Sequence, residues 1–288
     1  MASAKRGAMT TTASTSSLPN TAQPRVVVIP VAYGAEAGLA QGPRAVLEAS
    51  RRIESFDDEL GYEPFAVGVA AAAPLWDEPP FANTERAVGD TLDRGQFPIV
   101  LGGEHSLALG AVRAVWKRNQ DLAVVQISAG LQLKETPENP YVRHSFAARV
   151  RDYGLPVVQV GARAATRSEV EKVTDASGVF WARHYRGATG SGRAWDIPDV
   201  LAAVPERPLY LSIDLGVLDP GVFPGSGTLE PGGLGWYPLI ELVRQLFVSR
   251  EVLACDLAEV VPIPGQPHSE RLAARLLHKL VGYRFWRG

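Results

Sequence analysis

The chain has 288 residues, of which 46% are hydrophobic and 21% charged, so it can bury one large core or two small ones. Its formal net charge of −2, without any stripe of Lys and Arg interleaved with aromatic residues, excludes an electrostatic case for binding nucleic acid. A single cysteine, Cys255, excludes an internal disulfide framework, and no apolar run is long enough to span a bilayer. We therefore expect a cytoplasmic protein with neither a nucleic-acid nor a membrane partner.

Residues 1–24 are rich in Ser, Thr and Ala and show no apolar periodicity. Such a segment cannot bury enough apolar surface to offset the entropy of ordering it, which predicts a disordered tail. It also lacks the apolar stretch of a secretory signal. The remainder, residues 25–288, contains no fixed-period repeat and no Gly/Ser-rich linker, and is predicted to form a single domain.

Short β-branched apolar runs alternate with longer segments whose apolar residues recur at helical spacing. The predicted strands are 25–31, 98–103, 122–128, 156–162, 208–214 and 252–260. The predicted helices are 42–53, 83–95, 106–118, 237–249 and 269–285. This alternation is typical of βαβ units, and predicts an α/β fold: a three-layer α/β/α sandwich with a mostly parallel central sheet. Residues 128–146 and 183–197 are predicted to be surface loops.

Polar residues gather where three of the predicted strands end, in "GGEHS" (102–106), "SIDLGVLDPGVFPGSGTLEPGG" (212–233) and "CDLAEVVP" (255–262). In an open parallel sheet, side chains converge over a crevice at the carboxyl ends of the strands. Glu259 lies inside an apolar strand pattern, where an unpaired carboxylate would be costly. These three segments are therefore the candidate site.

Four motifs, in this order, resemble the ureohydrolase family of arginases, agmatinases and related amidine hydrolases. "QGPRAVLEASRRIESFDDELG" resembles the N-terminal Gly-Pro-containing helix of the family, and "LGGEHSLALG" its first metal motif. "LSIDLGVLDPGVFPGSGTLEPGGL" is similar to the Ser-Ile-Asp-x-Asp-x-x-Asp-Pro signature with its Gly-rich tail, and "ACDLAEVVP" to the late Asp-x-x-Glu-x-x-Pro strand. The resemblance covers nearly all of residues 25–288 and implies an arginase-like fold.

The resemblance also implies a centre of two manganese ions that share a bridging hydroxide, which attacks a guanidinium carbon and releases urea. In the family, a His from the first motif, an Asp-Ala-His-x-Asp segment and an Asp-x-Asp pair hold the metals. The corresponding positions in this sequence are His105, Ser128, Gly130, Gln132, Asp214 and Gly216. Only His105 and Asp214 keep a family ligand. Because hydroxyl and amide oxygens are weak neutral ligands and glycine has no side chain to donate, we expect no manganese cofactor.

Three further residues fall on functional positions of the family. His144, in "RHSFAAR", is placed by the resemblance on a histidine implicated in proton transfer, although the loop before it is two residues longer than in the family. Glu259 falls on the acid that receives the substrate guanidinium, and Arg163 on the arginine of an Ile-Gly-x-Arg motif. We expect all three to be vestiges of a substrate site. Without a metal, His105 and Asp214 are expected to pair with each other.

Three hypotheses follow for the function. The first is a catalytically inactive family member with a structural or regulatory role in a homo-oligomer, or in a mixed oligomer with an active paralogue. The second is an active agmatinase-like hydrolase of amidines or guanidines, in which His105 and Asp214, with Glu104, His144 or Glu259 as a further ligand, hold an atypical metal. The third is a metal-free binder of a small guanidino or amine ligand. The emptied metal positions favour the first, and the aromatic residues of the C-terminal "YRFWRG" suggest an interface.

Overall fold

The computed structural model describes residues 24–34, 36, 38–136, 138–174, 178–187 and 193–286. The predicted tail lies outside these residues except for Pro24, whose carbonyl accepts a hydrogen bond from the Gln96 side chain at 2.7 Å. Within the described part of the chain, no helix combines the length and the apolar character that a membrane span needs.

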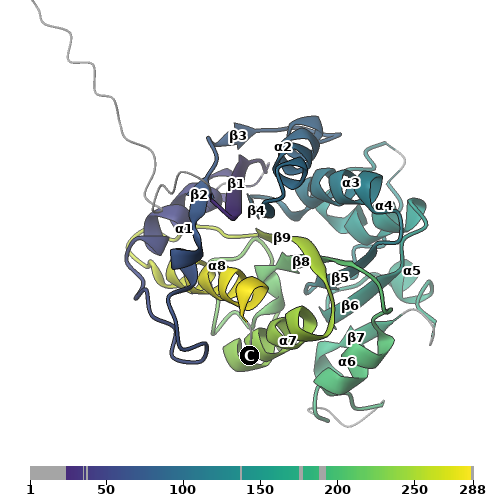
Figure 1. The fold of residues 1–288 in the computed structure, drawn as a ribbon. Coiled ribbons are helices and arrows are strands. Elements are labelled where there is room, and N and C mark those ends of the chain that lie inside the picture. The colour runs from purple at the N-terminus through teal and green to yellow at the C-terminus, as the bar shows by residue number, and fades with distance from the viewer. Residues whose placement is uncertain are drawn as a thin grey trace, which may run out of the picture.

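The centre of the molecule is a nine-stranded sheet in which all strand pairs are parallel (Figure 1). Its order is β2-β1-β4-β9-β8-β5-β6-β7, with β3 paired to β1 beyond the end of β2. The strands are β1 (Val26–Ala32), β2 (Val69–Ala71), β3 (Leu75–Trp76), β4 (Phe97–Gly102), β5 (Ala123–Ile127), β6 (Val157–Ala162), β7 (Val179–Trp181), β8 (Leu209–Asp214) and β9 (Val252–Ala258). The central strands are buried on both faces and are mostly apolar because helices cover both faces.

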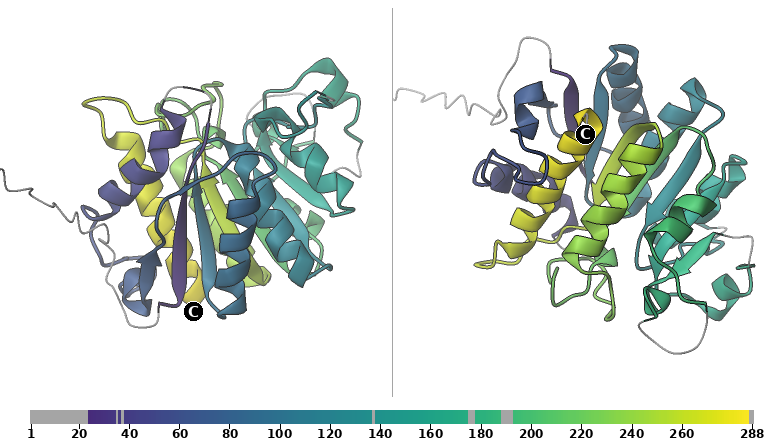
Figure 2. Two further views of the ribbon diagram at one scale, coloured as in Figure 1. Left: turned by 90° about the horizontal axis from the view of Figure 1, so that it is seen from above. Right: turned by 60° about the horizontal axis from the view of Figure 1, so that its bottom comes forward.

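Helices cover the two faces of the sheet and form two separate cores (Figure 2). The helices are α1 (Gly42–Ser50), α2 (Ala82–Asp93), α3 (Ala108–Arg118), α4 (Phe146–Asp152), α5 (Arg167–Val170), α6 (Ile197–Ala203), α7 (Trp236–Ser249) and α8 (His268–Phe285). Apolar residues of α1, α6, α7 and α8 pack against one face of the sheet, and those of α2, α3 and α4 against the other. The predicted three-layer α/β/α fold is confirmed.

The six predicted strands and five predicted helices are present, with ends shifted by a few residues. The short edge strands β2, β3 and β7 and the helices α4, α5 and α6 were not predicted. The prediction that 128–146 is a surface loop was wrong in its first part, because Ala129, Leu131 and Leu133 are buried. Gly130 forms a bridge to Ala164 beyond the end of β6, which holds this segment against the sheet.

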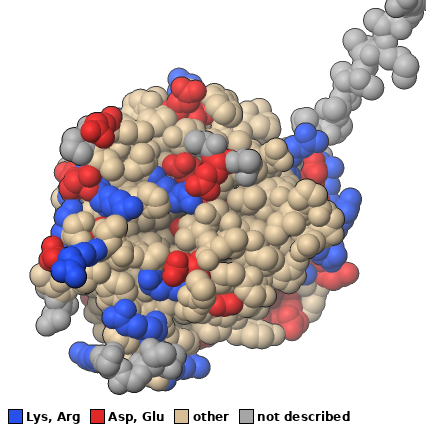
Figure 3. All heavy atoms as spheres, turned by 180° about the vertical axis from the view of Figure 1, so that it is seen from behind, with Lys and Arg blue, Asp and Glu red and all other residues tan. Residues whose placement is uncertain are grey.

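The expected C-terminal apolar patch is also not present in the form predicted. Tyr283 is buried, and its hydroxyl donates to Glu59 Oε2 at 2.9 Å. Phe285 and Trp286 pack against the core, and the Arg25 guanidinium lies 4.0 Å from the centre of the Phe285 ring. These aromatic residues therefore stabilise the fold of the chain itself. On the molecular face in Figure 3, acidic and basic side chains are intermixed among neutral ones.

Candidate functional site

Four adjacent strands deliver the predicted site residues to one place. His105, Ser128, Asp214 and Glu259 lie at or just beyond the carboxyl ends of β4, β5, β8 and β9, and these strands are consecutive in the sheet. The turn after β4 requires glycine, since a Cβ at Gly103 would lie 1.9 Å from a backbone oxygen of Tyr33. The convergence of side chains expected at this edge of the sheet is therefore observed.

His105 is fully buried, and both nitrogens of its ring are bonded to protein atoms. Nδ1 lies 3.0 Å from Gln132 Oε1, and Nε2 lies 2.7 Å from Ser212 Oγ. Because an amide oxygen only accepts, Nδ1 carries the proton and Nε2 accepts from the serine hydroxyl. Burial lowers the pKa of His105, although Asp214 raises it in part. The ring is thus neutral, and it lies 4.6 Å from the ring of Phe146.

Gln132 connects side chains that stand at the family's metal-ligand positions. Its Oε1 accepts from His105 Nδ1 and from Gln126 Nε2 at 2.8 Å, while its Nε2 donates to Ser128 Oγ at 3.2 Å and lies 3.5 Å from Asp214 Oδ2. Its φ of 53° is uncommon for a residue other than glycine, and such backbone strain gathers at functional sites. The side chain therefore occupies the space between His105 and Asp214.

The expected direct pair of His105 and Asp214 was wrong. Asp214 Oδ2 accepts from Ser128 Oγ at 2.8 Å, and its Oδ1 from the backbone N–H of Gly216 at 2.8 Å. Gln132 bridges the two residues instead, because its amide offers an acceptor to one and a donor to the other. The carboxylate of Asp214 is satisfied by neutral donors.

The same network continues through a row of buried polar residues across the sheet. Gln126 is paired in register with Gln159 of β6 and with Ser212 of β8, and Ser212 with Asp256 of β9. Gln159 Nε2 donates to Gln126 Oε1 at 2.9 Å. Sequence reasoning missed these residues, although each interrupts an apolar run. A polar residue at the centre of a buried strand is the signal that could have found them.

Asp256 stands at the end of this row and carries its carboxyl group. The side chain is fully buried, and neither oxygen accepts a hydrogen bond from a residue that the structure describes. Burial raises the pKa of Asp256 to about 7, while the nearby hydroxyls of Tyr210 and Ser212 lower it only in part, since neither has the geometry of a hydrogen bond. His105 Nε2 lies 3.8 Å from Asp256 Oδ2. A protonated Asp256 is consistent with a neutral His105.

Glu259 is the other buried acid of the site. Its Oε1 accepts from the backbone N–H of His105 at 2.9 Å, and among the described residues none donates a hydrogen bond to its Oε2. Burial and the charge of Asp214 raise the pKa of Glu259 to about 8. Its φ is 71°, and a Cβ at Gly227 would lie 2.3 Å from Oε2, so a larger residue at 227 would force the carboxylate to shift. The backbone is therefore shaped around this carboxylate.

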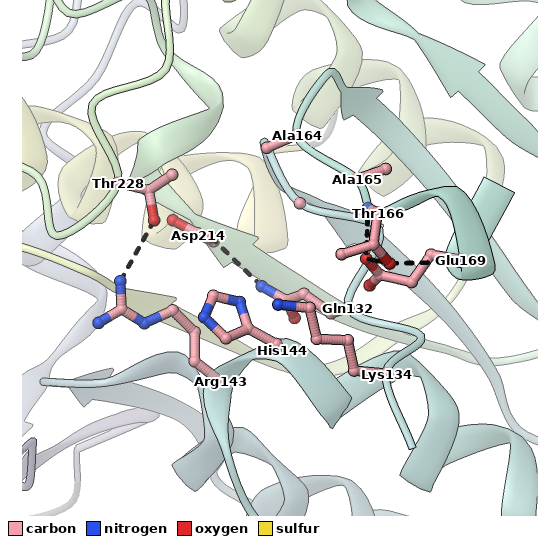
Figure 4. Close-up of a pocket in the computed structure, with 11 residues that line it drawn as sticks. Gln132, Lys134, Arg143, His144, Ala164, Ala165, Thr166, Glu169, Asp214 and Thr228 are labelled. Atoms are coloured by element: carbon pink, nitrogen blue, oxygen red, sulfur yellow. Dashed lines mark hydrogen bonds between the residues drawn. The ribbon is translucent and has the colours of Figure 1, made fainter. Parts of the chain in front are cut away.

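A cavity of about 200 Å³ opens over Asp214 (Figure 4). Its lining includes His144, together with Lys134 and Arg143, which sequence reasoning missed. His144 is exposed at the cavity, and its partial burial together with the charges of Lys134 and Arg143 lowers its pKa. In Figure 4 the side chains of Lys134, Arg143 and His144 lie on the side of the cavity opposite Ala164, Ala165 and Thr166.

Arg163 does not line this cavity, contrary to the expectation of a substrate-binding role. It donates to the carbonyls of Gly216 at 2.8 Å, Val217 at 3.1 Å and Leu218 at 3.2 Å, and to those of Glu230 at 2.7 Å and Pro231 at 3.1 Å. Its guanidinium therefore ties the loop after β8 to the end of β6. Arg163 therefore has a structural role: it fixes the loop after β8.

The residues at the six family positions do not fit two manganese ions. Ser128, Gln132 and two glycines replace the other ligands, and no lone pair of the His105 ring is free. In the part of the chain that the structure describes, no group of three or more His, Cys, Asp or Glu side chains could hold a metal ion. The donor set here is mostly neutral, whereas two adjacent dications require several carboxylates.

The model of the Arginase family matches residues 24–282. The chain belongs to the arginase family. It is 35% identical to an N(1)-aminopropylagmatine ureohydrolase of Synechocystis sp. over 275 residues, covering 90% of this chain and 88% of that protein. It is 32% identical to an agmatinase of Bacillus anthracis, covering 82% of each. The family predicted from the four motifs is confirmed.

Solved structures of the arginase family share the fold. Proclavaminate amidino hydrolase from Streptomyces clavuligerus superposes with a TM-score of 0.78 at 24% identity, covering 93% of this chain and 95% of that one. A putative agmatinase from Clostridium difficile gives the same TM-score at 20% identity, covering 91% and 97%. The arginase-like architecture is therefore shared with these solved structures.

Proposed function

We propose that this arginase-family protein does not hydrolyse guanidino compounds at a two-manganese centre, and that it acts as a structural or regulatory subunit. The proposal is supported by the hydrogen-bonded network of mostly neutral side chains at the positions where the family resemblance implies metal ligands. Gln132 lies between His105 and Asp214 and is bonded to both sides. Nδ1 of His105 donates its proton to this amide and Nε2 accepts from the Ser212 hydroxyl, so the ring has no free lone pair. A glutamine amide and a serine hydroxyl cannot offset the charge of two dications.

We therefore expect the purified protein to carry no stoichiometric manganese and to release no urea from arginine, agmatine or guanidinobutyrate. Metal content is measured by mass spectrometry after dialysis against manganese, and urea release by a colorimetric assay, each with an active agmatinase as a positive control. Two manganese ions per chain, or hydrolysis of a guanidino compound that a chelator abolishes, would refute the proposal.

A second candidate is an active hydrolase of guanidino or amidino compounds, and the comparisons favour it. Relatives at 30% identity or more are named as ureohydrolases or agmatinases, and nothing in the comparisons indicates a loss of activity. Such an enzyme would need an atypical metal site built from His105, Asp214 and further donors such as Glu104, His144 or Glu259. The discriminating result is turnover with fewer than two metal ions per chain.

A third candidate is a metal-free binder of a small guanidino or amine ligand. The cavity over Asp214 and the buried acid Glu259 support it, since both carboxylates lie at the same end of the sheet. Binding of agmatine in the presence of a chelator, without urea release, is the observation that separates this candidate from the second.

We further propose that the protein forms a homo-oligomer, or a mixed oligomer with an active paralogue. Support comes from the family resemblance and from the exposed aromatic side chains Phe56 and Tyr237, which line one surface hollow and are 55% and 77% exposed. Light scattering at micromolar concentration should give a multiple of the 30.9 kDa chain mass. A mass near that of one chain, both alone and with the co-expressed paralogue, would count against an oligomer.

A further inference from the structure

Arg143 places a guanidinium of the chain itself next to the buried acid of the site. It begins the short 3-10 helix η4 (Arg143–Ser145), and its side chain is only 10% exposed. Nη1 lies 3.4 Å from Glu259 Oε2 and donates to the Gly227 carbonyl at 3.0 Å, while Nη2 donates to Glu36 Oε1 at 2.6 Å. The guanidinium is therefore held between one buried and one exposed carboxylate.

The charges around Arg143 show how strongly this position favours a cation. Burial opposes the charge on the guanidinium, but Glu259, Glu36 and Asp214 outweigh it and raise the pKa of Arg143. The carboxylate oxygen that faces Arg143 accepts no hydrogen bond from any described residue, and Gly227 closes against the same oxygen. An ionised Glu259 thus depends on a cation at this place, because a buried carboxylate without a partner is costly.

The open cavity is bounded by the same side chain. Arg143 and Lys134 both line it, and Figure 4 shows the guanidinium of Arg143 extending toward Thr228, beside Asp214. Lys134 and Arg143 therefore place two positive charges on the lining of the cavity, whereas Glu259 is buried behind it and does not line it. A cationic ligand could contact that carboxylate only if Arg143 moved away.

We propose that the guanidinium of Arg143 occupies the position at Glu259 where a cationic ligand would bind, and that Glu36 holds it there. Without a change in this arrangement, guanidinium and ammonium ligands are excluded from the Glu259 carboxylate. This inference rests on the proposed assignment of the cavity as the ligand pocket, but not on the absence of hydrolysis. Glu36 is 59% exposed on its side chain and lies between Gly34 and Gly38, both at positive φ. Release of Glu36 is the change that would free Arg143.

Agmatine is a suitable probe, and its affinity is measured by calorimetry in the presence of a chelator, so that no metal contributes. Arg143→Ala should bind agmatine about tenfold more tightly than the unmodified protein, because it leaves Glu259 Oε2 without its cationic neighbour; tenfold corresponds to about 1.4 kcal/mol. Arg143→Lys, which keeps a cation, is the matched control. Its increase in the logarithm of the agmatine affinity should be less than half of that of Arg143→Ala. Adding Glu259→Gln to Arg143→Ala should remove the gain.

Because Arg143→Ala leaves a buried acid unpaired, it can destabilise the fold, and Glu36→Gln serves as a second variant at a mostly exposed position. It should increase the affinity for agmatine about threefold, since it releases only the outer anchor of Arg143. Thermal unfolding of Arg143→Ala, Glu259→Gln and the double variant tests the pairing itself without any ligand. The effects of Arg143→Ala and Glu259→Gln on the unfolding temperature are expected to be non-additive.

Two results would overturn the inference. One is agmatine binding to the unmodified protein as tight as that to folded Arg143→Ala and Glu36→Gln. The other is that Arg143→Ala and Glu259→Gln have strictly additive effects on stability. Neither result concerns hydrolysis, whose proposed absence is tested separately by metal content and urea release. An increase in agmatine affinity alongside measurable urea release would support the occupant and refute the proposed lack of activity.

Discussion

The combined variant Ser128→Asp, Gly130→His, Gln132→Asp and Gly216→Asp should convert a chain without stoichiometric manganese into one that binds it. Three carboxylates and an imidazole would return to positions that the backbone already presents at the ends of β5 and β8. Removing the Gln132 amide also frees Nδ1 of His105 and Oδ2 of Asp214, which the amide now contacts. Two manganese ions per chain, measured by mass spectrometry and calorimetry, are expected.

The structure indicates which of the four changes is hardest to accommodate. A Cβ at Gly130 meets nothing closer than Gln132 Cγ at 3.4 Å, whereas a Cβ at Gly216 would lie 2.9 Å from Asp214 Oδ1. The triple variant that keeps Gly216 should therefore fold more stably but bind fewer than two ions. The matched control carries Asn in place of each new Asp, and should bind no manganese. Equal metal content in the control and the acidic variant would contradict the role of the carboxylates.

Asp256→Asn should make the protein more stable, by an amount that grows with pH. The pKa of Asp256 is raised from 3.8 to about 7 in the folded chain, so this acid binds its proton more tightly when folded. Its cost to stability is absent below the unfolded pKa, increases as pH rises toward 7, and is constant above 7. Between pH 5 and pH 9 the advantage of the Asn variant should increase on the order of 2 to 3 kcal/mol.

Chemical denaturation at several pH values measures this difference directly. Asp58→Asn is the matched control, because it makes the same chemical change at an exposed position and should shift the unfolding free energy little at any pH. A difference between the Asp256→Asn and unmodified proteins that is independent of pH would contradict the assignment of a perturbed acid. A less stable Asn variant at pH 9 would do the same.

The fold was predictable because the central strands are buried on both faces. Such strands appear as continuous β-branched runs, as in 25–31 and 122–128, and the four motifs between them fixed the family. The edge strand β7 (Val179–Trp181) was missed because three partly buried residues carry no such run. The seven-residue helix α4 was missed because it follows directly on a segment without periodicity.

The site was predictable only in part, for reasons of geometry. His105, Asp214 and Glu259 could be assigned to strand ends, but the bridging role of Gln132 depends on a φ of 53°, which no sequence pattern revealed. The position of Arg143 depends on a side-chain contact with Glu36, more than one hundred residues away in the sequence. The row of Gln126 and Gln159 was visible as polar residues in apolar runs, yet their partnership requires β5 and β6 to be neighbours.

The Arg163 clamp has a consequence for how this pocket can evolve. One guanidinium holds five carbonyls of the segment 216–231 in place, and it does so from the end of β6, outside the former ligand set. The wall of the pocket is thus anchored without any contribution from a metal. Metal-ligand residues can be exchanged while the wall of the pocket keeps its shape. The shape of the pocket and its chemistry can therefore evolve separately. A new specificity in this lineage then requires changes in a few inward side chains and no refolding of the loop that surrounds them.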